Sequence, residues 1–383
     1  MIAPAAVSTP LPNLLDLTPA DLVRELTALG QPAYRARQVL HWVYQRLVDD
    51  FAAMTDLPQA LRRELAARFR LRLVEPLAEL TDPDGTRKVL LGLTMDPAMA
   101  GVRSPQRAER WRRFNAVESV LMVYRPRGSG RQIRSVCVST QVGCAMNCPF
   151  CATGQSGFVR DLTAGEIVAQ VLYFARRLRE TEGPSARITN VVFMGQGEPL
   201  ANFENTWAAL EALTDPARFG LGARHITVST VGVVPHILEL ARRPLPVNLA
   251  VSLHAPNDDL RNVLVPLNRK YPLADLMAAC REYIALTRRR ITFEYTLMAG
   301  VNDSLDHMAE LADLLRGLLC HVNLIPVNPT PGGRYQPPSP EHVRRLEQAL
   351  RARGLPVTVR VERGQRIEAA CGQLRLREIQ AVR

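Results

Sequence analysis

Residues 143–151, which read Gly-Cys-Ala-Met-Asn-Cys-Pro-Phe-Cys, decide the fold and the chemistry of this chain. Cys144, Cys148 and Cys151 are spaced C-x3-C-x2-C, with an aromatic residue directly before the third cysteine. A structural zinc site needs four ligands and usually joins one C-x2-C to a second ligand pair, and no such pair lies near this stretch. Three thiolates instead suit a 4Fe-4S cluster that leaves one iron open, because thiolates are the usual ligands of such clusters. The spacing therefore favours an iron–sulfur site.

The sequence around this stretch predicts parallel βα units. From about residue 134 onward, short apolar runs alternate with helical stretches, such as those at 164–181, 272–286 and 305–319. Six strands are predicted, at residues 134–139, 190–195, 225–230, 247–254, 291–298 and 322–328. Six such units predict an α/β fold, either a partial (β/α)6 TIM-like barrel or a doubly wound sheet. Either arrangement places an active site at the carboxyl ends of the strands.

The remaining chain divides into two further regions. Residues 1–75 have apolar positions every three to four residues and predict a helical accessory domain. Residues 76–133 predict a β-hairpin extension with turns at 82–85 and 127–130. Residues 134–383 then form the barrel, with one more strand at 356–362 and a cysteine-containing tail.

Composition indicates a globular protein with an anionic partner. The chain has 383 residues, of which 47% are hydrophobic and 22% charged, so disorder and coiled coil are excluded. Its net charge of +11 favours nucleic acid, although 46 arginines against 2 lysines could also reflect GC-rich coding. No apolar run approaches the ~18 residues of a membrane span, and no basic residue precedes Arg24 as a signal peptide requires. We therefore expect a cytoplasmic protein that does not associate with membranes.

An arginine-rich segment lies inside the extension. Residues 103–134 hold nine arginines against two glutamates, with Trp111, Phe114 and Tyr124 among them. The part at 95–113 has the character of an insertion. Such a mixture could bind phosphates and stack bases, and a solvated charged loop explains it about equally well.

Polar residues follow several predicted strands. Gly197 and Glu198 come after the second strand, where glycine lets the backbone approach a ligand and the carboxylate can accept hydrogen bonds from an ammonium. The ends of later strands carry Ser229, Ser252, Leu253, His254 and Asn328. These positions could line the mouth of a barrel, and each alone is equally consistent with ordinary strand capping. Two other cysteines stand apart: Cys137 could face the barrel interior, and Cys371 alone reads as a buried thiol.

Taken together, the motifs resemble those of a known family. The C-x3-C-x2-C loop resembles the signature of the radical S-adenosylmethionine superfamily. Residues 141–144, 148–154, 252–257 and 369–374 occur together as in the RlmN/Cfr family of RNA adenine methyltransferases. The resemblance extends over nearly the whole chain. It departs from the family at Gln196, where methionine is common, and at residues 364–367, where an acidic residue is usual.

The resemblance implies a mechanism and roles for named residues. Cys371 would carry a methyl group on its sulfur, Glu118 would accept a proton, and Cys137 would form a transient disulfide with Cys371. The family's cofactor positions fall on Gly197, Glu198, Ser229, Ser252, Leu253, His254 and Asn328. Two molecules of S-adenosylmethionine would be used per turnover, and a low-potential reductant such as flavodoxin would supply the electron. The substrates would be 23S rRNA and tRNA, modified at carbon 2 of adenine by a monomeric enzyme.

Three alternatives stay open from sequence. A Cfr-type enzyme methylates carbon 8 of the same class of adenine with the same cysteines, so the motifs do not separate the two. The long N-terminal region and the context of residues 143–146 favour carbon 2. A non-catalytic RNA-binding protein with structural zinc would leave Cys137 and Cys371 without a role. A simple iron–sulfur electron carrier would normally use four thiolates at its cluster.

Overall fold

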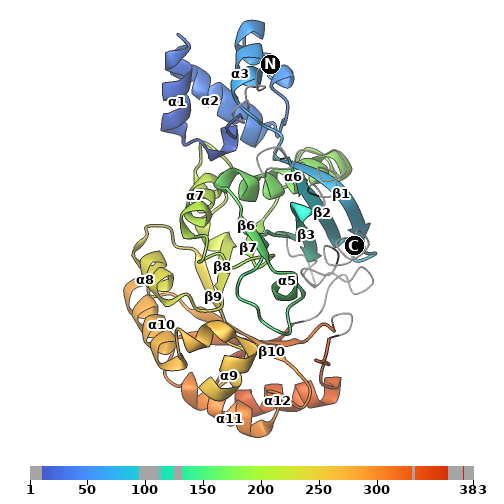
Figure 1. Ribbon diagram of the computed structural model, residues 1–383, viewed down its shortest axis with the longest axis vertical. Coiled ribbons are helices and arrows are strands. Elements are labelled where there is room, and N and C mark those ends of the chain that lie inside the picture. Colours follow the sequence, from blue (N-terminus) through green and yellow to red (C-terminus); the bar gives the residue numbers. More distant parts are fainter. Residues whose placement is uncertain are drawn as a thin grey trace, which may run out of the picture.

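A curved sheet forms the centre of the computed structural model, which describes residues 11–94, 111, 114–124, 132–329, 333–360 and 374. Seven parallel strands lie side by side in chain order: β4 (Ile133–Cys137), β7 (Asn190–Phe193), β8 (Ile226–Thr230), β9 (Asn248–Ser252), β10 (Ile291–Leu297), β11 (Cys320–Pro326) and β12 (Val357–Val359). They include all six predicted strands and the further strand predicted before the tail. The prediction of a partial α/β barrel is confirmed, and Figure 1 shows its arc of strands.

Three antiparallel strands extend this sheet beyond β4. They are β1 (Val74–Thr81), β2 (Arg87–Leu93) and β3 (Ala116–Tyr124), and they complete a ten-stranded sheet. The predicted hairpin therefore belongs to the barrel sheet, because β3 pairs with β4 in the register Val120 to Cys137. The first predicted turn is present, with the Gly85 N–H donating to the Asp82 carbonyl. Residues 127–130 lie outside the described part.

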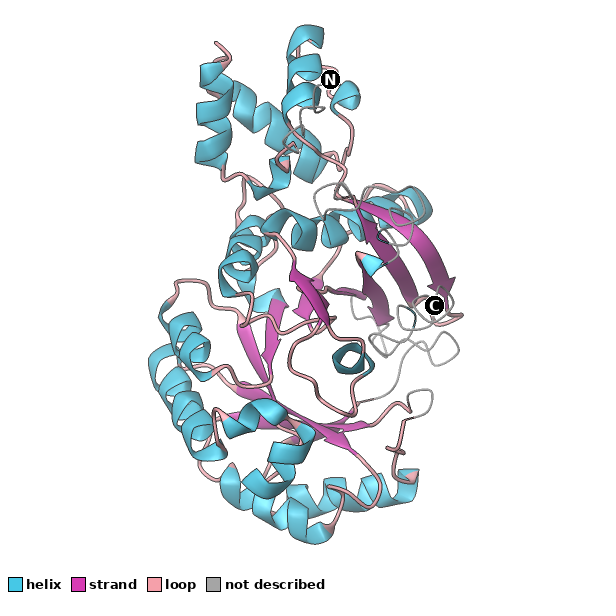
Figure 2. Cartoon of the chain, viewed as in Figure 1, coloured by secondary structure: helices cyan, strands magenta, loops and turns pink. Residues whose placement is uncertain are grey.

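The strands present two different faces. Successive side chains of a strand point to opposite sides. One face is apolar and fully buried, as at Val191, Val228 and Phe293. Helices cover this outer face (Figure 2): α6 (Ala164–Glu182), α7 (Phe203–Thr214), α8 (Val234–Arg242), α10 (Leu273–Thr287), α11 (Leu305–Leu314) and α12 (Pro340–Ala352), with the 3-10 turn η5 (Ala223–His225) before β8. The short helix α9 (Asp258–Leu264) and the 3-10 turn η6 (Pro266–Arg269) follow β9, and their apolar residues pack in the same cluster as Cys148. The alternate residues face the inside of the barrel, and many of them are polar.

A helical module precedes the sheet, as predicted. Its elements are η1 (Leu14–Asp16), α1 (Pro19–Ala28), α2 (Tyr34–Leu40), η2 (His41–Gln45), η3 (Phe51–Ala53) and α3 (Gln59–Arg68). Thr18 begins α1 with a capping box, in which it exchanges hydrogen bonds with Asp21. The module packs on α6: the Gly165 N–H donates to Asp16 at 2.6 Å, and Arg176 Nε donates to the Leu47 carbonyl at 2.7 Å. In the described part of the chain, no helix has the length and apolar character that crossing a membrane requires.

Candidate active site

The three-cysteine stretch forms a loop that is closed at its base by two short strands. These are β5 (Gln141–Gly143) and β6 (Phe158–Asp161), and the short helix α5 (Ala152–Gln155) begins directly after Cys151. Gly143 has a φ of +81°, and a Cβ there would lie 1.8 Å from the Gly157 carbonyl oxygen. This close approach allows the Cys144 N–H to donate to the same oxygen at 3.0 Å. Glycine at position 143 thus allows the backbone contact that fixes the position of Cys144, the first cysteine of the loop.

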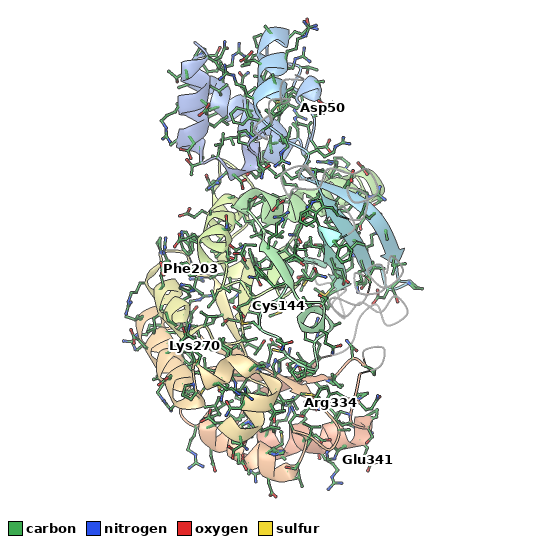
Figure 3. All side chains as sticks on the ribbon, viewed as in Figure 1. Asp50, Cys144, Phe203, Lys270, Arg334 and Glu341 are labelled. Atoms are coloured by element: carbon green, nitrogen blue, oxygen red, sulfur yellow. The ribbon has the colours of Figure 1, made fainter. Side chains whose placement is uncertain are left out.

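The loop lies against the inside of the barrel. Figure 1 shows α5 on the concave side of the strands, and Figure 3 labels Cys144 there. A cavity of about 230 Å³ separates the loop from the carboxyl ends of β7 to β11. Its walls include eight of the predicted site residues: Cys144, Cys148, Cys151, Gly197, Glu198, Ser229, Ser252 and His254. Residues from one loop and three strand ends therefore meet at one place.

Two predicted cofactor residues do not line this cavity. Leu253 is fully buried in the main hydrophobic core, because it alternates with Ser252 and points to the helix-covered face. Its backbone N–H donates to the Glu294 carbonyl at 2.9 Å. Asn328 lies two residues beyond the end of β11 and is half-buried.

Two glycines after β7 let the chain pass close to the segment that runs from the end of β4 into β5. A Cβ on Gly195 would lie 2.6 Å from the Val138 carbonyl oxygen, and one on Gly197 would lie 2.6 Å from Gln141 Cβ. Gly197 also has a φ of +98°, which disfavours any side chain. Only glycine fits at positions 195 and 197, and the close packing of this segment places the Glu198 carboxylate on the cavity wall.

Glu198 is a buried carboxylate held by backbone donors. The Leu200 N–H donates to Oε1 at 2.9 Å, and the Val231 N–H donates to Oε2 at 2.8 Å. Burial raises the pKa of Glu198 to about 7, while these two N–H groups and Thr230 act to lower it. A carboxylate has about four acceptor positions, so Glu198 can also accept hydrogen bonds from a ligand ammonium.

His254 is a neutral hydrogen-bonding group on the wall of the same cavity. Burial, and then the Arg261 charge, lower the pKa of His254 to about 3. Its Nδ1 accepts from the Thr296 N–H at 3.1 Å, so the ring proton is on Nε2. The ring also meets Phe150 edge-on, with 4.9 Å between centroids. His254 can therefore donate a hydrogen bond while it packs against the cysteine loop.

Arg261 holds the loops that carry these residues. Its side chain is 1% exposed and donates to the carbonyls of Val231, Ser252 and Leu253, at 2.6, 3.3 and 3.1 Å, and to Asn268 at 2.8 Å. These carbonyls lie at the end of β9 and directly after β8 and β9, in segments whose residues Val231, Ser252 and His254 line the cavity. Sequence reasoning missed this residue, because nothing in the local pattern shows that a helical arginine is buried.

The predicted proton acceptor and resolving cysteine lie farther along the inner face. Cys137 is directly opposite Val120 in the sheet, and Glu118 is two residues from Val120 on β3, so all three face the same side. Ser139 links this part to the glycine segment: its hydroxyl donates to the Glu118 carbonyl at 2.6 Å and accepts from the Gln196 N–H at 2.8 Å. Cys371 lies outside the described residues.

Comparisons with known proteins identify the family of the chain. Residues 138–315 match the radical SAM superfamily, and residues 12–71 match the ribosomal RNA large subunit methyltransferase N-terminal domain. A probable dual-specificity RNA methyltransferase RlmN from Roseiflexus castenholzii is 47% identical over 95% of this chain and 96% of its own. One from Chloroflexus aurantiacus is 48% identical over 94% and 92%. The crystal structure of a radical SAM methyltransferase from Sphaerobacter thermophilus is similar at a TM-score of 0.85, with 51% identity over 95% of this chain and 99% of that one.

The chain belongs to the RlmN family. The prediction of a radical S-adenosylmethionine methyltransferase is confirmed, and the zinc-stabilised binding protein and the electron carrier are not supported. The superfamily implies a 4Fe-4S cluster and S-adenosylmethionine.

The donor set fits the RlmN family's cluster. Three thiols line one cavity beside a carboxylate and a neutral imidazole, and apolar residues such as Val265 and Met298 pack around Cys148. Burial raises the pKa of Cys144 to about 12 and also raises that of Cys148, so metal binding must release protons. Among the described residues, no three His, Cys, Asp or Glu side chains are gathered as a single-ion site needs. The fit therefore rests on donor chemistry and the shared cavity.

The cavity has one acidic wall residue that sequence reasoning missed. Glu294, on β10, is 7% exposed, lines the cavity and accepts from Asn323 Nδ2 at 2.8 Å. Burial raises the pKa of Glu294, against the effects of Asn323 and Arg360. The sequence did offer a sign of Glu294, because a carboxylate stands in the middle of an otherwise largely apolar predicted strand, at a position that alternates with the buried apolar residues.

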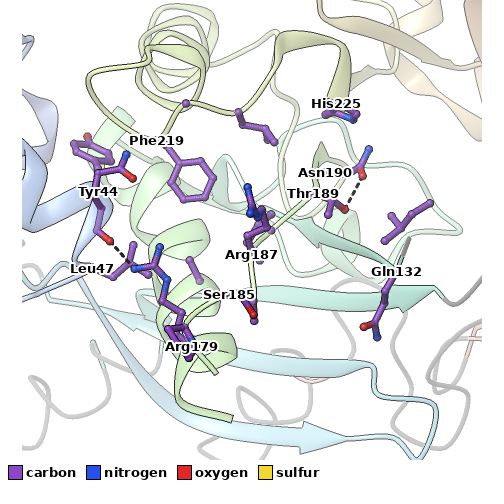
Figure 4. A pocket seen from close by; sticks show the side chains of 18 residues that line it. Tyr44, Leu47, Gln132, Arg179, Ser185, Arg187, Thr189, Asn190, Phe219 and His225 are labelled. Carbon is purple, nitrogen blue, oxygen red and sulfur yellow. Dashed lines mark hydrogen bonds between the residues drawn. The ribbon is translucent and has the colours of Figure 1, made fainter. Parts of the chain in front are cut away.

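A larger cavity lies at the other end of the strands. It has a volume of about 700 Å³ and lies between the helical module and the amino ends of β4 and β7 (Figure 4). Tyr44, Arg179, Arg187 and His225 line it, and no cysteine, aspartate or glutamate is among its described lining residues. In βα barrels this end serves stability, so size does not mark the site here.

Proposed function

We propose that this enzyme methylates carbon 2 of an adenine in 23S rRNA, and of the adenine beside the anticodon in tRNA. The observation that carries the proposal is the shared inner face of the sheet, which holds the cofactor cavity, Cys137 and Glu118. Leu374, three residues after Cys371, packs with Leu90 and Ala116 on β2 and β3. Because Leu90 lies opposite Glu118, this contact supports a tail that reaches the same face.

The cofactor would be held by residues around the small cavity. Cys144, Cys148 and Cys151 would each bind one iron, and Glu198 would accept hydrogen bonds from the S-adenosylmethionine ammonium. Ser229, Ser252 and the His254 Nε2–H face the same space and would bind its polar groups. When bound, the cluster supplies the electron that cleaves S-adenosylmethionine to methionine and a 5′-deoxyadenosyl radical. Such a radical is needed because carbon 2 of adenine is not nucleophilic enough for direct methyl transfer.

Cys371 would act first. Its thiolate would attack the methyl carbon of one S-adenosylmethionine, so that the sulfonium–methyl bond breaks and S-adenosylhomocysteine leaves. That S-methyl group would then give a hydrogen atom to the 5′-deoxyadenosyl radical from the second S-adenosylmethionine. 5′-Deoxyadenosine would leave, and a methylene radical would remain on the Cys371 sulfur. Addition of this carbon to adenine carbon 2 would join protein and RNA covalently.

Glu118 and Cys137 would release the product. The adduct radical would pass one electron to a one-electron acceptor, such as the oxidised cluster, and the Glu118 carboxylate would accept the proton from carbon 2. The Cys137 thiolate would then attack the sulfur of Cys371, so that an S–S bond forms, the carbon–sulfur bond breaks and the new methyl group takes up a proton. A dithiol or enzymatic reductant must reduce this S–S bond before the next cycle.

The partners follow from charge and chemistry. A net charge of +11 suits a polyanionic RNA substrate, and the helical module would contribute to its binding. We propose a cytoplasmic monomer that receives electrons from a low-potential donor such as flavodoxin. The contribution of residues 95–113 is tested by replacing Arg110, Arg112 and Arg113 with alanine. An unchanged RNA affinity and salt slope would exclude it.

The test is anaerobic turnover of iron-reconstituted protein with S-adenosylmethionine, reductant and unmodified 23S rRNA or tRNA. Nucleoside mass spectrometry against 2-methyladenosine and 8-methyladenosine standards then reads the position. 2-Methyladenosine, lost in Cys371→Ala, supports the proposal. 8-Methyladenosine would make this a Cfr-type enzyme, and release of 5′-deoxyadenosine without methylated RNA would show that the RNA substrate is wrong.

A further inference from the structure

Glu118 makes an ion pair inside the protein. Lys88 Nζ lies 2.8 Å from Glu118 Oε2, and the two side chains are 0% and 2% exposed. Lys88 is opposite Val120 in the β2–β3 register and Leu90 is opposite Glu118, so the pair spans neighbouring positions of the inner face. Among the described residues, the apolar side chains of Leu90 and Val120 lie directly opposite the pair in the sheet register and are 1% and 4% exposed.

The identity of the cation is informative in this chain. Only 2 of its 48 basic residues are lysines, and the other, Lys270, is exposed. Compositional bias therefore does not account for lysine at position 88. A compact ammonium with three donors fits a closed apolar space, whereas a planar guanidinium needs more room and more acceptors.

Burying one charge without its counter-ion is costly, and removing either partner of a buried pair typically destabilises a protein by roughly 3–5 kcal/mol. A pair with no role is often replaceable by apolar residues without loss. The Lys88–Glu118 pair lies on the same inner face as Cys137. A buried pair at this position is explained if the reaction needs a carboxylate that is shielded from water.

We propose that Lys88 is a positioning residue for the proton-transfer step, which rests on the proposed role of Glu118. The ammonium pairs with the carboxylate away from water and fixes Oε2 at the inner face of the sheet. When the carbon 2 proton moves to Glu118, the carboxyl becomes neutral and Lys88 stays protonated. No electron and no other bond changes at Lys88.

The test follows separate stages of the reaction in Lys88→Met and Glu118→Gln. Lys88→Met removes the charge and keeps a similar chain length, and Lys270→Met is the matched control. S-methylation of Cys371, read by peptide mass spectrometry, and 5′-deoxyadenosine formation should stay within about twofold of the native enzyme. The covalent protein–RNA adduct should accumulate in both variants, and release of methylated RNA should fall at least roughly tenfold, since a positioned base contributes about 10²–10⁴-fold.

Folding is checked in parallel, because Lys88→Met leaves a buried carboxylate. The double variant Lys88→Met/Glu118→Gln should regain melting temperature while still trapping the adduct. Lys88→Arg keeps the charge and should release more product than Lys88→Met. Where Lys88→Met does not fold, Lys88→Gln is measured instead, with the same expected trapping.

The outcomes separate the two levels of the argument. Adduct trapping in both single variants supports the inference. Native product release by the uncharged Lys88 variant, with trapping in Glu118→Gln, would overturn the role of Lys88 and leave the proposed function intact. Native release by both variants would mean that Glu118 is not the proton acceptor, and the inference would fall with it.

Discussion

Each end of the barrel holds a cavity, and the smaller of the two is the one lined by potential cofactor ligands. The cavity at the carboxyl ends of the strands has about 230 Å³ and contains three cysteines, two glutamates and a buried histidine. The one at the amino ends has about 700 Å³ and is lined by arginines, aromatic residues and small polar side chains. The difference teaches that donor chemistry and strand direction locate this active site, and that volume would have pointed to the wrong end.

The largest effect is expected from removing a cluster ligand. Cys148→Ala should lower the iron content from about four atoms per chain and abolish 5′-deoxyadenosine formation, because two thiolates cannot replace three. Iron analysis and electron paramagnetic resonance of anaerobically purified protein measure this. Cys280→Ala is the control, since Cys280 is also buried but lies in α10 and does not line the cavity. Full iron and activity in Cys148→Ala would contradict the site assignment.

The next effect is on stability and tests what holds the small cavity together. Arg261→Met removes all the side-chain donors that Arg261 supplies to buried carbonyls of the two wall segments. Leaving these acceptors unpaired costs about 1–3 kcal/mol each, so the melting temperature should fall by at least roughly 5 °C. Arg269→Met, at an exposed arginine nearby, should have little effect. Equal melting curves for the two variants would show that water replaces these donors.

How much of this site the sequence predicted depends on how local each signal is. The cysteine loop and the glycine segment were found because their residues are consecutive, and eight predicted residues do meet at one cavity. Leu253 was grouped with its neighbours, although strand alternation sends it to the opposite face. The Lys88–Glu118 pair was missed because the two residues belong to different strands and meet only through the sheet register.

A smaller effect is expected at the acidic wall. Glu198→Gln removes a charge-assisted hydrogen bond to the ligand ammonium, so S-adenosylmethionine should bind roughly 10- to 100-fold more weakly. With the native protein, affinity should fall as the pH drops below about 7, because the carboxyl then becomes neutral. It should also fall above about pH 8, where the ligand amine loses its proton.

Calorimetric titration of reconstituted protein between pH 6 and pH 9 measures this dependence. In Glu198→Gln the acid limb should disappear while the alkaline limb is retained. Glu204→Gln, at an exposed glutamate of α7, should keep the native profile. An acid limb that persists in Glu198→Gln would assign it to another group, with Glu294 the next carboxylate on the cavity wall.

The smallest effect is expected at the large cavity, and it is the direct test of the comparison. Arg187 is exposed and lines this cavity, where no acidic side chain is among the described lining residues. If this end serves only stability, Arg187→Ala should change S-adenosylmethionine affinity and RNA methylation by less than about twofold. If it instead contacts RNA phosphates, binding should weaken for all RNA sequences, and the salt slope should fall by about one. Weaker RNA binding with a smaller salt slope would mean that the basic residues of the larger cavity bind the substrate, at the end of the barrel opposite the active site.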